Sequence, residues 1–240
     1  MTAAPIAYAA ILNGDGRNNT LYGTSGRDTI KGNGGNDLIY GYGGSDTLRR
    51  NRQRQNLWMA QSQQLYGNDG NDYMIATNGG NEDDGPNFMY RGARHDRMFA
   101  YGCDGCGTGF YISGGSGNDH IEGYDAPREI YGGSGDDMIY ASGDTHYEIF
   151  GGGGSDEISV NTDSGGALHG GKGGDDYLFT NDGRLFGDDG DDTLKTEWGD
   201  SEYTGGSGAD QFLCSEYEGD VVTDYNPSEG DVVSSDCEEF

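Results

Sequence analysis

The stretch GGSGDDMIY (132–140) is repeated along the chain, most clearly as GTSGRDTIK (23–31), GGSGNDHIE (114–122), GGGGSDEIS (151–159) and GDDGDDTLK (187–195). Each copy has a glycine-rich turn, an acidic residue and a triplet with an aliphatic residue in its centre. Glycine permits the positive φ values that such tight turns need. In an extended triplet, alternate side chains point to opposite faces, so the eighth residue, such as Ile139, points inward. Two copies therefore make one coil with two strands and two turns.

The turns bring together backbone carbonyl oxygens and one carboxylate each. Calcium accepts about six to eight such oxygens in irregular cages. Zinc prefers Cys and His ligands, and magnesium keeps several of its waters. The pattern therefore predicts that the chain binds multiple calcium ions.

The composition agrees with a metal-dependent fold. The 240 residues include 47 glycines, 32% are hydrophobic, and the net charge is -28. Such a chain buries little apolar surface to offset its ordering entropy, so we expect disorder without metal. Divalent cations would bring its charge toward an ordinary surface value. The acidity argues against nucleic acid as a partner, and no stretch has the length and apolarity of a membrane span.

The template G-G-x-G-x-D-x-U-x followed by these copies resembles the RTX (repeats-in-toxin) calcium-binding repeat. The resemblance spans about residues 14–213. It implies an all-β fold, a right-handed parallel β-roll or β-solenoid of about eleven coils, capped by residues 1–13 and 214–240. It also implies a protein that is secreted or displayed at the cell surface, without a cleaved N-terminal signal peptide.

The sixth residues of the turns are the expected calcium ligands. One column, which from Asp119 onward recurs every 17 to 19 residues, is assigned Asn19, Asp37, Asp72, Asp119, Asp137, Asp156, Asp175, Asp192 and Asp210. A second column on the other edge of the roll is assigned Asp28 and Asp46. The resemblance implies that carbonyl oxygens of one turn join the Asp of the next, among them those of Gly114, Ser116, Asn118, Gly132, Ser134 and Asp136.

The later half-coils of the second column lose the glycine pattern but keep an aspartate at a constant place. These residues are Asp125, Asp144, Asp163, Asp182 and Asp200. Two interpretations are open. Each carboxylate can accept N–H bonds from its own turn, as in Asx-turns. Alternatively the column binds weaker cations, because stacked carboxylates repel one another unless they are bridged.

Residues 50–66 and 91–113 are atypical coils. The first, RNRQRQNLWMAQSQQLY, keeps Leu57 and Leu65 in the inward register but has Arg and Gln in its turns. We interpret it as a coil in which Arg52 or Arg54 supplies the positive charge in place of calcium. A solvated basic loop is the alternative.

RGARHDRMF, which begins at Arg91, is expected to repeat this arginine substitution with Arg94 and Arg97. Loops are expected near 76–90 and 101–113. Four cysteines in an extracellular chain favour two disulfides, Cys103 with Cys106 and Cys214 with Cys237, although a CxxC pair also occurs in redox and zinc sites.

No catalytic motif is present, and we expect no enzymatic activity. The four histidines, His95, His120, His146 and His169, fall on repeat positions without a shared nucleophile, and no G-x-S-x-G, H-E-x-x-H or P-loop occurs. RTX arrays commonly accompany an enzyme or toxin module, and we find no such module in these residues. An accessory role within an enzyme is therefore a minor alternative.

A row of outward-facing aromatic residues is the candidate binding surface. Its members are Tyr66, Tyr90, Tyr131, Phe150, His169 and Phe186. The rings could simply stack along the sheet, or they could bind an extracellular polysaccharide or another copy of the protein. Regular Thr or Asx rows, which would favour ice binding, are absent. We predict a structural or adhesive, self-assembling calcium-binding module, with polysaccharide binding as the alternative.

Overall fold

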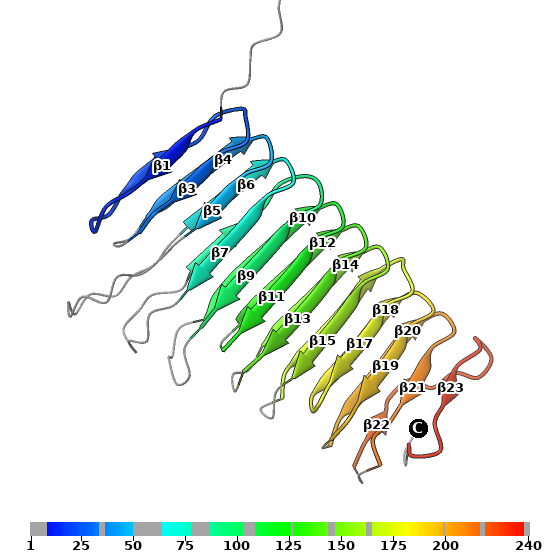
Figure 1. Ribbon diagram of the computed structural model, residues 1–240. Helices are drawn as coiled ribbons and strands as arrows, with labels where there is room; N and C mark the ends of the chain where they lie inside the picture. Colours follow the sequence, from blue (N-terminus) through cyan, green and yellow to red (C-terminus); the bar gives the residue numbers. More distant parts are fainter. Residues whose placement is uncertain are drawn as a thin grey trace, which may run out of the picture.

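A computed structural model describes residues 9–33, 37–49, 64–77, 87–102, 109–125, 127–143, 147–161, 165–198, 200–216 and 219–237. These residues form two parallel β-sheets, and the chain alternates between them, so that each strand pairs with the next strand but one. Figure 1 shows the strands following one another in sequence order from the blue to the red end. The expected all-β parallel solenoid is confirmed. Within the described residues, no helix is long and apolar enough to cross a membrane.

The first sheet contains the twelve odd-numbered strands and is called the odd sheet. Its strands are β1 (Ile11–Asn13), β3 (Thr29–Lys31), β5 (Thr47–Arg49), β7 (Tyr73–Thr77), β9 (Arg97–Tyr101), β11 (His120–Tyr124), β13 (Met138–Ser142), β15 (Glu157–Asn161), β17 (Tyr177–Thr180), β19 (Thr193–Thr196), β21 (Gln211–Leu213) and β23 (Val232–Val233).

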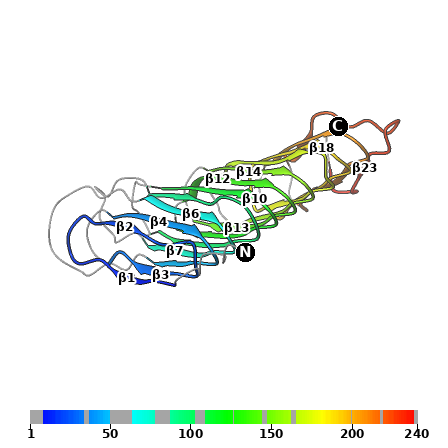
Figure 2. The same ribbon diagram turned by 90° about the horizontal axis from the view of Figure 1, so that it is seen from above.

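The second sheet contains the eleven even-numbered strands and is called the even sheet. Its strands are β2 (Thr20–Tyr22), β4 (Leu38–Gly43), β6 (Gln64–Asp69), β8 (Asn87–Tyr90), β10 (Phe110–Ser116), β12 (Pro127–Ser134), β14 (Glu148–Gly153), β16 (Ala167–Lys172), β18 (Arg184–Asp189), β20 (Glu202–Ser207) and β22 (Val221–Val222). Figure 2 shows the two sheets as two layers, with β2 and β4 over β1 and β3.

One large inward-pointing residue in most strands, often joined by a second buried residue such as Ala141 of β13, builds the core between the layers. In β13, Ile139 is buried while Met138 beside it is exposed, and Ile139 lies opposite Ile158 of the next coil. Burying an aliphatic side chain of this kind contributes about 1.5–3 kcal/mol. The core is continuous from Ile30 to Phe212 but only two side chains wide, so the turns must supply part of the stability.

Close stacking of the turns explains the second glycine of the repeat. Gly133 has a φ of 122°, which L side chains rarely adopt. A Cβ at this position would lie 2.1 Å from the carbonyl oxygen of Gly115 in the preceding coil. The backbones of adjacent turns are therefore in direct contact, and a side chain here would separate the coils.

The strands that flank segment 50–66 do not pair as expected for a separate coil, and residues 50–63 lie outside the described residues. β5 ends at Arg49 and β6 begins at Gln64. Because β6 pairs directly with β4 and Leu65 lies opposite Ile39, the segment makes one connection between the sheets, and the coil count differs slightly from the expected one. Leu65 is buried as expected. Leu57, Arg52 and Arg54 lie outside the described residues.

The expected loops near 76–90 and 101–113 are shorter than predicted. β7 extends to Thr77, β8 begins at Asn87, β9 extends to Tyr101 and β10 begins at Phe110. Strand pairing within the odd and even sheets therefore continues through both segments. The expected Cys103–Cys106 disulfide lies outside the described residues.

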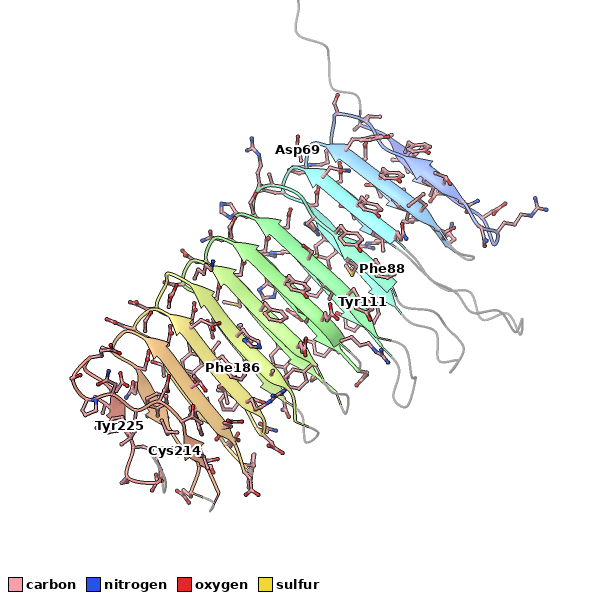
Figure 3. The ribbon with its side chains drawn as sticks, turned by 180° about the vertical axis from the view of Figure 1, so that it is seen from behind. Asp69, Phe88, Tyr111, Phe186, Cys214 and Tyr225 are labelled. Atoms are coloured by element: carbon pink, nitrogen blue, oxygen red, sulfur yellow. A yellow bond between two sulfur atoms is a disulfide. The ribbon has the colours of Figure 1, made fainter. Side chains whose placement is uncertain are left out.

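The C-terminal segment continues the two sheets before it closes the roll. β22 pairs with β20, and β23 pairs with β21. A disulfide joins Cys214 to Cys237, as expected from the sequence. Tyr225 packs against the core beside them, and Figure 3 shows Cys214 and Tyr225 at this end of the roll.

Candidate metal centre

A row of buried aspartates occupies the turns that lead from the even sheet to the odd sheet. Each residue directly precedes an odd-numbered strand, as Asp137 precedes β13 and Asp156 precedes β15. We call this row the aspartate ladder. Its members, all buried, are Asp28, Asp46, Asp72, Asp96, Asp119, Asp137, Asp156, Asp176, Asp192, Asp210 and Asp231.

One oxygen of each carboxylate is fixed by the backbone of the preceding coil. The N–H of Asp119 donates to Oδ1 of Asp137 at 2.7 Å, and the N–H of Asp137 donates to Oδ1 of Asp156 at 2.8 Å. The same bond joins every neighbouring pair of the ladder from Asp28 to Asp231. The carboxylates are thus held in a line, one in each coil.

The other oxygen, Oδ2, has no hydrogen-bond donor in nine members of the ladder within the described part of the chain. These members are Asp46, Asp72, Asp96, Asp119, Asp137, Asp156, Asp176, Asp192 and Asp210. A buried acceptor left unsatisfied costs about 1–3 kcal/mol, and more when it is charged. Burial raises the pKa of Asp137 and of Asp192 to about 7, although a backbone hydrogen bond acts in the opposite direction in each.

In most of these turns Oδ2 points toward the first glycine of the turn, where a second oxygen approaches. A Cβ on Gly132 would lie 2.5 Å from Oδ2 of Asp137 and 2.6 Å from the carbonyl oxygen of Gly151. The same two groups converge in the neighbouring turn, where a Cβ on Gly114 would lie 2.6 Å from Oδ2 of Asp119 and 2.3 Å from the oxygen of Gly132. The absence of a side chain at the first position therefore keeps a cradle of oxygens open.

The donors in this cradle fit a hard cation. They are a carboxylate oxygen and a backbone carbonyl oxygen, which are the ligand types that calcium prefers. Within the described ranges, no three His, Cys, Asp or Glu side chains form a metal-binding group. Each turn of the ladder contributes one carboxylate to its cradle. A divalent cation at the cradle would satisfy Oδ2 and offset the repulsion between successive carboxylates.

The two ends of the ladder differ from its middle. The hydroxyl of Thr24 donates to the Asp28 carboxylate, at 3.0 Å from Oδ1. At the other end, the N–H of Asn226 donates to Oδ2 of Asp231 at 2.7 Å. Each terminal aspartate therefore has a donor within its own turn, and the need for a cation is concentrated in the nine inner members.

The ladder corrects the expected columns. Asp28 and Asp46 belong to the same edge as Asp72, because the N–H of Asp46 donates to Oδ1 of Asp72; Asn19 and Asp37 lie on the opposite edge, where the N–H of Asn19 donates to Asp37. The expected columns were assigned to the wrong edges because the chain changes sheet once, and not twice, between β5 and β6.

In the turn at 170–176, Asp176 and not Asp175 holds the ladder position. Asp175 is exposed on the outside of that turn. This turn has one extra residue after its glycines, which moves the aspartate that precedes β17 by one place. The direct signal for Asp176 was its position just before the strand triplet Tyr-Leu-Phe.

Sequence reasoning also missed Asp96 and Asp231 as members of the ladder. Asp96 ends the turn RGARHD, two residues before the inward Met98, and Asp231 directly precedes the Val-Val pair of β23. An aspartate followed by a short apolar triplet would have found both, even where the glycines are lost.

The carbonyl groups expected as ligands are distributed differently from the prediction. The oxygen of Gly132 faces Asp119 of the preceding turn, whereas we expected it to join Asp156 of the following one. Ser116 and Ser134 each accept an N–H of the preceding coil, from Arg94 and Gly117 respectively, both at 2.7 Å. Gly114 forms the cradle beside Asp119.

Two further predicted carbonyl ligands lie on the outer surface of the turns. The oxygen of Asn118 lies 3.2 Å from Nδ1 of His95. The carboxylate of Asp136 accepts the N–H of Ser155 at 3.1 Å. These contacts link exposed positions of successive coils outside the buried cradle.

Apart from Asn19 and Asp37 at its N-terminal end, the opposite edge of the roll carries no comparable row within the described residues. Asp37 is buried, and a Cβ on Gly32 would lie 2.4 Å from its Oδ2. The positions that precede even-numbered strands are Asn19, Asp37, Gly109, Tyr147, Gly166, Gly183, Ser201 and Asp220. The carboxylate of Asp220 accepts the N–H groups of Ser201 and Ser215 at 2.9 and 2.7 Å. Of the aspartates expected in the later second column, Asp125 and Asp200 are exposed, while Asp144 and Asp163 lie outside the described residues.

The aromatic residues of the even sheet form two stacks. The first contains Tyr22, Tyr40, Tyr66 and Tyr90, with ring centroids 5.1 to 5.3 Å apart. The second contains Tyr131, Phe150, His169 and Phe186, at 4.6 to 4.9 Å. Ser113 lies between Tyr90 and Tyr131 in the strand register and therefore separates the two stacks. Beside this gap, Phe88 stacks on Tyr111 (Figure 3).

A parallel solenoid with glycine turns and a buried aspartate ladder is a calcium-binding β-roll. A family model for the RTX calcium-binding nonapeptide repeat, in four copies, matches residues 13–48, 64–82, 111–126, 129–145 and 182–212. Over these segments the chain belongs to the family of RTX calcium-binding nonapeptide-repeat proteins, as the resemblance predicted. No curated protein and no solved structure matches it.

Proposed function

We propose that the protein is an extracellular module that folds when calcium binds and then acts as a structural or adhesive element. The observation that carries this proposal is the set of nine inner ladder aspartates with an unsatisfied buried Oδ2, in a chain with a net charge of -28. Without a cation, water solvates these carboxylates better in the unfolded chain. A ligand that binds only the folded state shifts the equilibrium toward it.

Two features support an extracellular location. The Cys214–Cys237 disulfide is of the kind that persists in oxidising compartments. Calcium sites in extracellular modules bind with dissociation constants of about 0.1–1 mM, and cradles that rely on one carboxylate in each turn suit this weak range.

A structural or adhesive role is supported by the N-terminal end of the described roll. β1 and β2 are the end strands of the two sheets, and Ile11 of β1 is 78% exposed. End strands with unpaired backbone groups are templates for further strands. We expect this end to contact a second copy of the chain once calcium has reduced the negative charge of both.

Polysaccharide binding is less well supported by the aromatic stacks. Sugars bind to the open faces of aromatic rings, whereas neighbouring rings here are nearly parallel, with interplanar angles of 5° to 18°. The faces cover one another, and mainly the edges reach solvent. Stacking that stabilises the even sheet accounts for the row without a ligand.

Circular dichroism and electron microscopy of the full chain would test the proposal. We expect most of the β signal to be absent in chelator and to return cooperatively at about 1 mM calcium, but not at the same concentration of magnesium. Filaments or end-to-end pairs should then appear in micrographs. A chain that is fully folded in chelator at neutral pH and low salt would contradict calcium-dependent folding, and monomers at saturating calcium would contradict self-assembly.

A further inference from the structure

One turn of the aspartate ladder has an arginine where the others begin with glycine. The turn RGARHD (91–96) joins β8 to β9 and lies between two of the segments that match the family model. The N–H of Arg91 donates to the carbonyl oxygen of Ser113 at 3.0 Å, and Asp96 keeps the ladder position. The turn also has the exposed Arg94 at its fourth position, where the repeat has glycine. The first side chain is therefore the departure that bears on the buried cradle.

The guanidinium of Arg91 is buried against the ladder. Its Nη1 lies 2.7 Å from Oδ1 of Asp96, and the side chains of both residues are 0% exposed. Nη1 also donates to the carbonyl oxygen of Asp72 at 2.6 Å, and Nη2 donates to the carbonyl oxygen of Arg97. One cation thus contacts the turn before it and the strand after it, and charge-assisted bonds of this kind are about twice as strong as neutral ones.

Arg91 also changes the cradle of the preceding turn. A Cβ on Gly67 would lie 2.4 Å from Oδ2 of Asp72, as in the other turns, but its next neighbouring residue is Arg91, whose Cδ lies 3.3 Å away. In the turn before, the corresponding neighbour of Gly41 is the carbonyl oxygen of Gly67 at 2.9 Å. An aliphatic carbon is therefore the nearest atom of the next coil here, where most other cradles have a carbonyl oxygen.

Charge and space both disfavour calcium in this gap. The guanidinium is a permanent cation at neutral pH, and a divalent ion beside it in a buried site would be strongly repelled. The gap also holds the Arg91 stem, whose Nε lies 2.8 Å from Sδ of Met74. Oδ2 of Asp72 and Oδ2 of Asp96 have no hydrogen-bond donor, as in the other inner members, but the charge and the stem of Arg91 leave a gap that does not fit calcium, in contrast to the turns on either side.

We propose that Arg91 takes the place of calcium between Asp72 and Asp96, so that one metal-independent coil divides the ladder into two separate calcium-binding segments. The first segment contains Asp46, and the second runs from Asp119 to Asp210. The β7–β9 junction then stays connected when calcium leaves either segment. This inference rests on calcium binding to the ladder, which the proposed function requires.

The test is the calcium stoichiometry of Arg91→Gly. This substitution restores a glycine at the first position, so the turn becomes GGARHD and the cradle opens. We expect the number of bound ions, measured by equilibrium dialysis, to rise by about one. Arg94→Gly is the matched control, since Arg94 is exposed in the same turn, and its stoichiometry should equal that of the wild type.

An unchanged stoichiometry in folded Arg91→Gly would overturn the inference, provided that the wild type binds calcium. A wild type that binds no calcium would instead refute the proposed function and the inference with it. If the variant does not fold, the inference can be tested by hydrogen exchange of the calcium-loaded wild type after addition of chelator. Amides of β7 and β9 should then lose protection later than those of β13 and β15, and simultaneous loss would overturn the inference.

Discussion

The backbone N–H of Asp156 donates to Oδ1 of Asp176 at 2.6 Å. Asp175, one residue earlier, is exposed, and its N–H donates to Oγ of Ser155 at 3.1 Å. Two adjacent aspartates of one turn thus have separate roles, one in the buried ladder and one on the outer surface. The pKa of Asp176 is raised to about 7, first by burial and also by the charge of Asp156, while the backbone hydrogen bond from Asp156 acts in the opposite direction. A bound cation would favour the ionised form of this carboxylate.

Replacing Asp176 by Ala should remove about one calcium ion and lower the free energy of unfolding by a few kcal/mol at saturating calcium, because the neighbouring oxygens lose their shared cation. Asp175→Ala should leave the number of bound ions unchanged and should change the free energy of unfolding by no more than about 0.5 kcal/mol, since it alters only the exposed face. Equilibrium dialysis and urea unfolding would measure both. Equal loss of calcium in the two variants would show that the ladder position is not the ligand.

Gly132→Ala should destabilise the calcium-loaded protein by about 1–3 kcal/mol and weaken calcium binding. The new Cβ would lie 2.5 Å from Oδ2 of Asp137 and 2.6 Å from the backbone oxygen of Gly151, and the latter cannot move without shifting the next turn. Gly153→Ala is the control, because its Cβ would meet only the oxygen of Lys172 at 3.5 Å. Calcium titrations monitored by circular dichroism would compare them. Similar midpoints for the two variants would argue against the cradle.

His169 should make the free energy of unfolding depend on pH below about 6.5. It lies between Phe150 and Phe186, with ring centroids at 4.7 and 4.6 Å, and burial lowers its pKa below 6.5 although Asp188 acts in the opposite direction. The folded state therefore binds this proton less readily than the unfolded state. The contribution of neutral His169 to the stability of the folded state is therefore complete above about pH 6.5, and it is lost as the pH falls below this value.

The substitution His169→Phe should remove this part of the pH dependence and keep the stack. Urea unfolding of both proteins at saturating calcium, at about pH 7.5 and 5.5, isolates the histidine, since the ladder carboxylates are common to both. The wild type should lose more stability on acidification than the variant. Identical losses would mean that the histidine titrates equally in the folded and unfolded states.

Loss of the Cys214–Cys237 disulfide should loosen only the C-terminal end of the roll. The bond closes a segment with a sequence separation of 23, for which chain entropy predicts about 3 kcal/mol of stabilisation. In the double variant with both cysteines replaced by serine, amides of β22 and β23 should exchange faster, while those of β13 and β15 keep their protection, because solenoid stability is nearly a sum over neighbouring coils. Uniformly faster exchange along the roll would contradict this local effect.

The sequence by itself determined the parallel solenoid, the inward residues and the preference for calcium. These follow from chemistry within one repeat. The glycines of GGSGDDMIY set the turn, Ile139 sets the inward register, and the oxygen donors of the turn select a hard cation. None of these steps depends on residues outside the repeat, so local reasoning was sufficient for them.

The tertiary structure decided which edge each turn occupies and which arginine enters the ladder. The edge depends on how many half-coils lie between two repeats, and the length of segment 50–66 is compatible with one long connection or a whole coil. Strand pairing of β6 with β4 settles this and places Asp46 above Asp72. Arg91 bonds to Asp96 of its own turn and to the carbonyl oxygen of Asp72 in the preceding coil. The second contact joins two coils, and spacing within the repeat does not encode it.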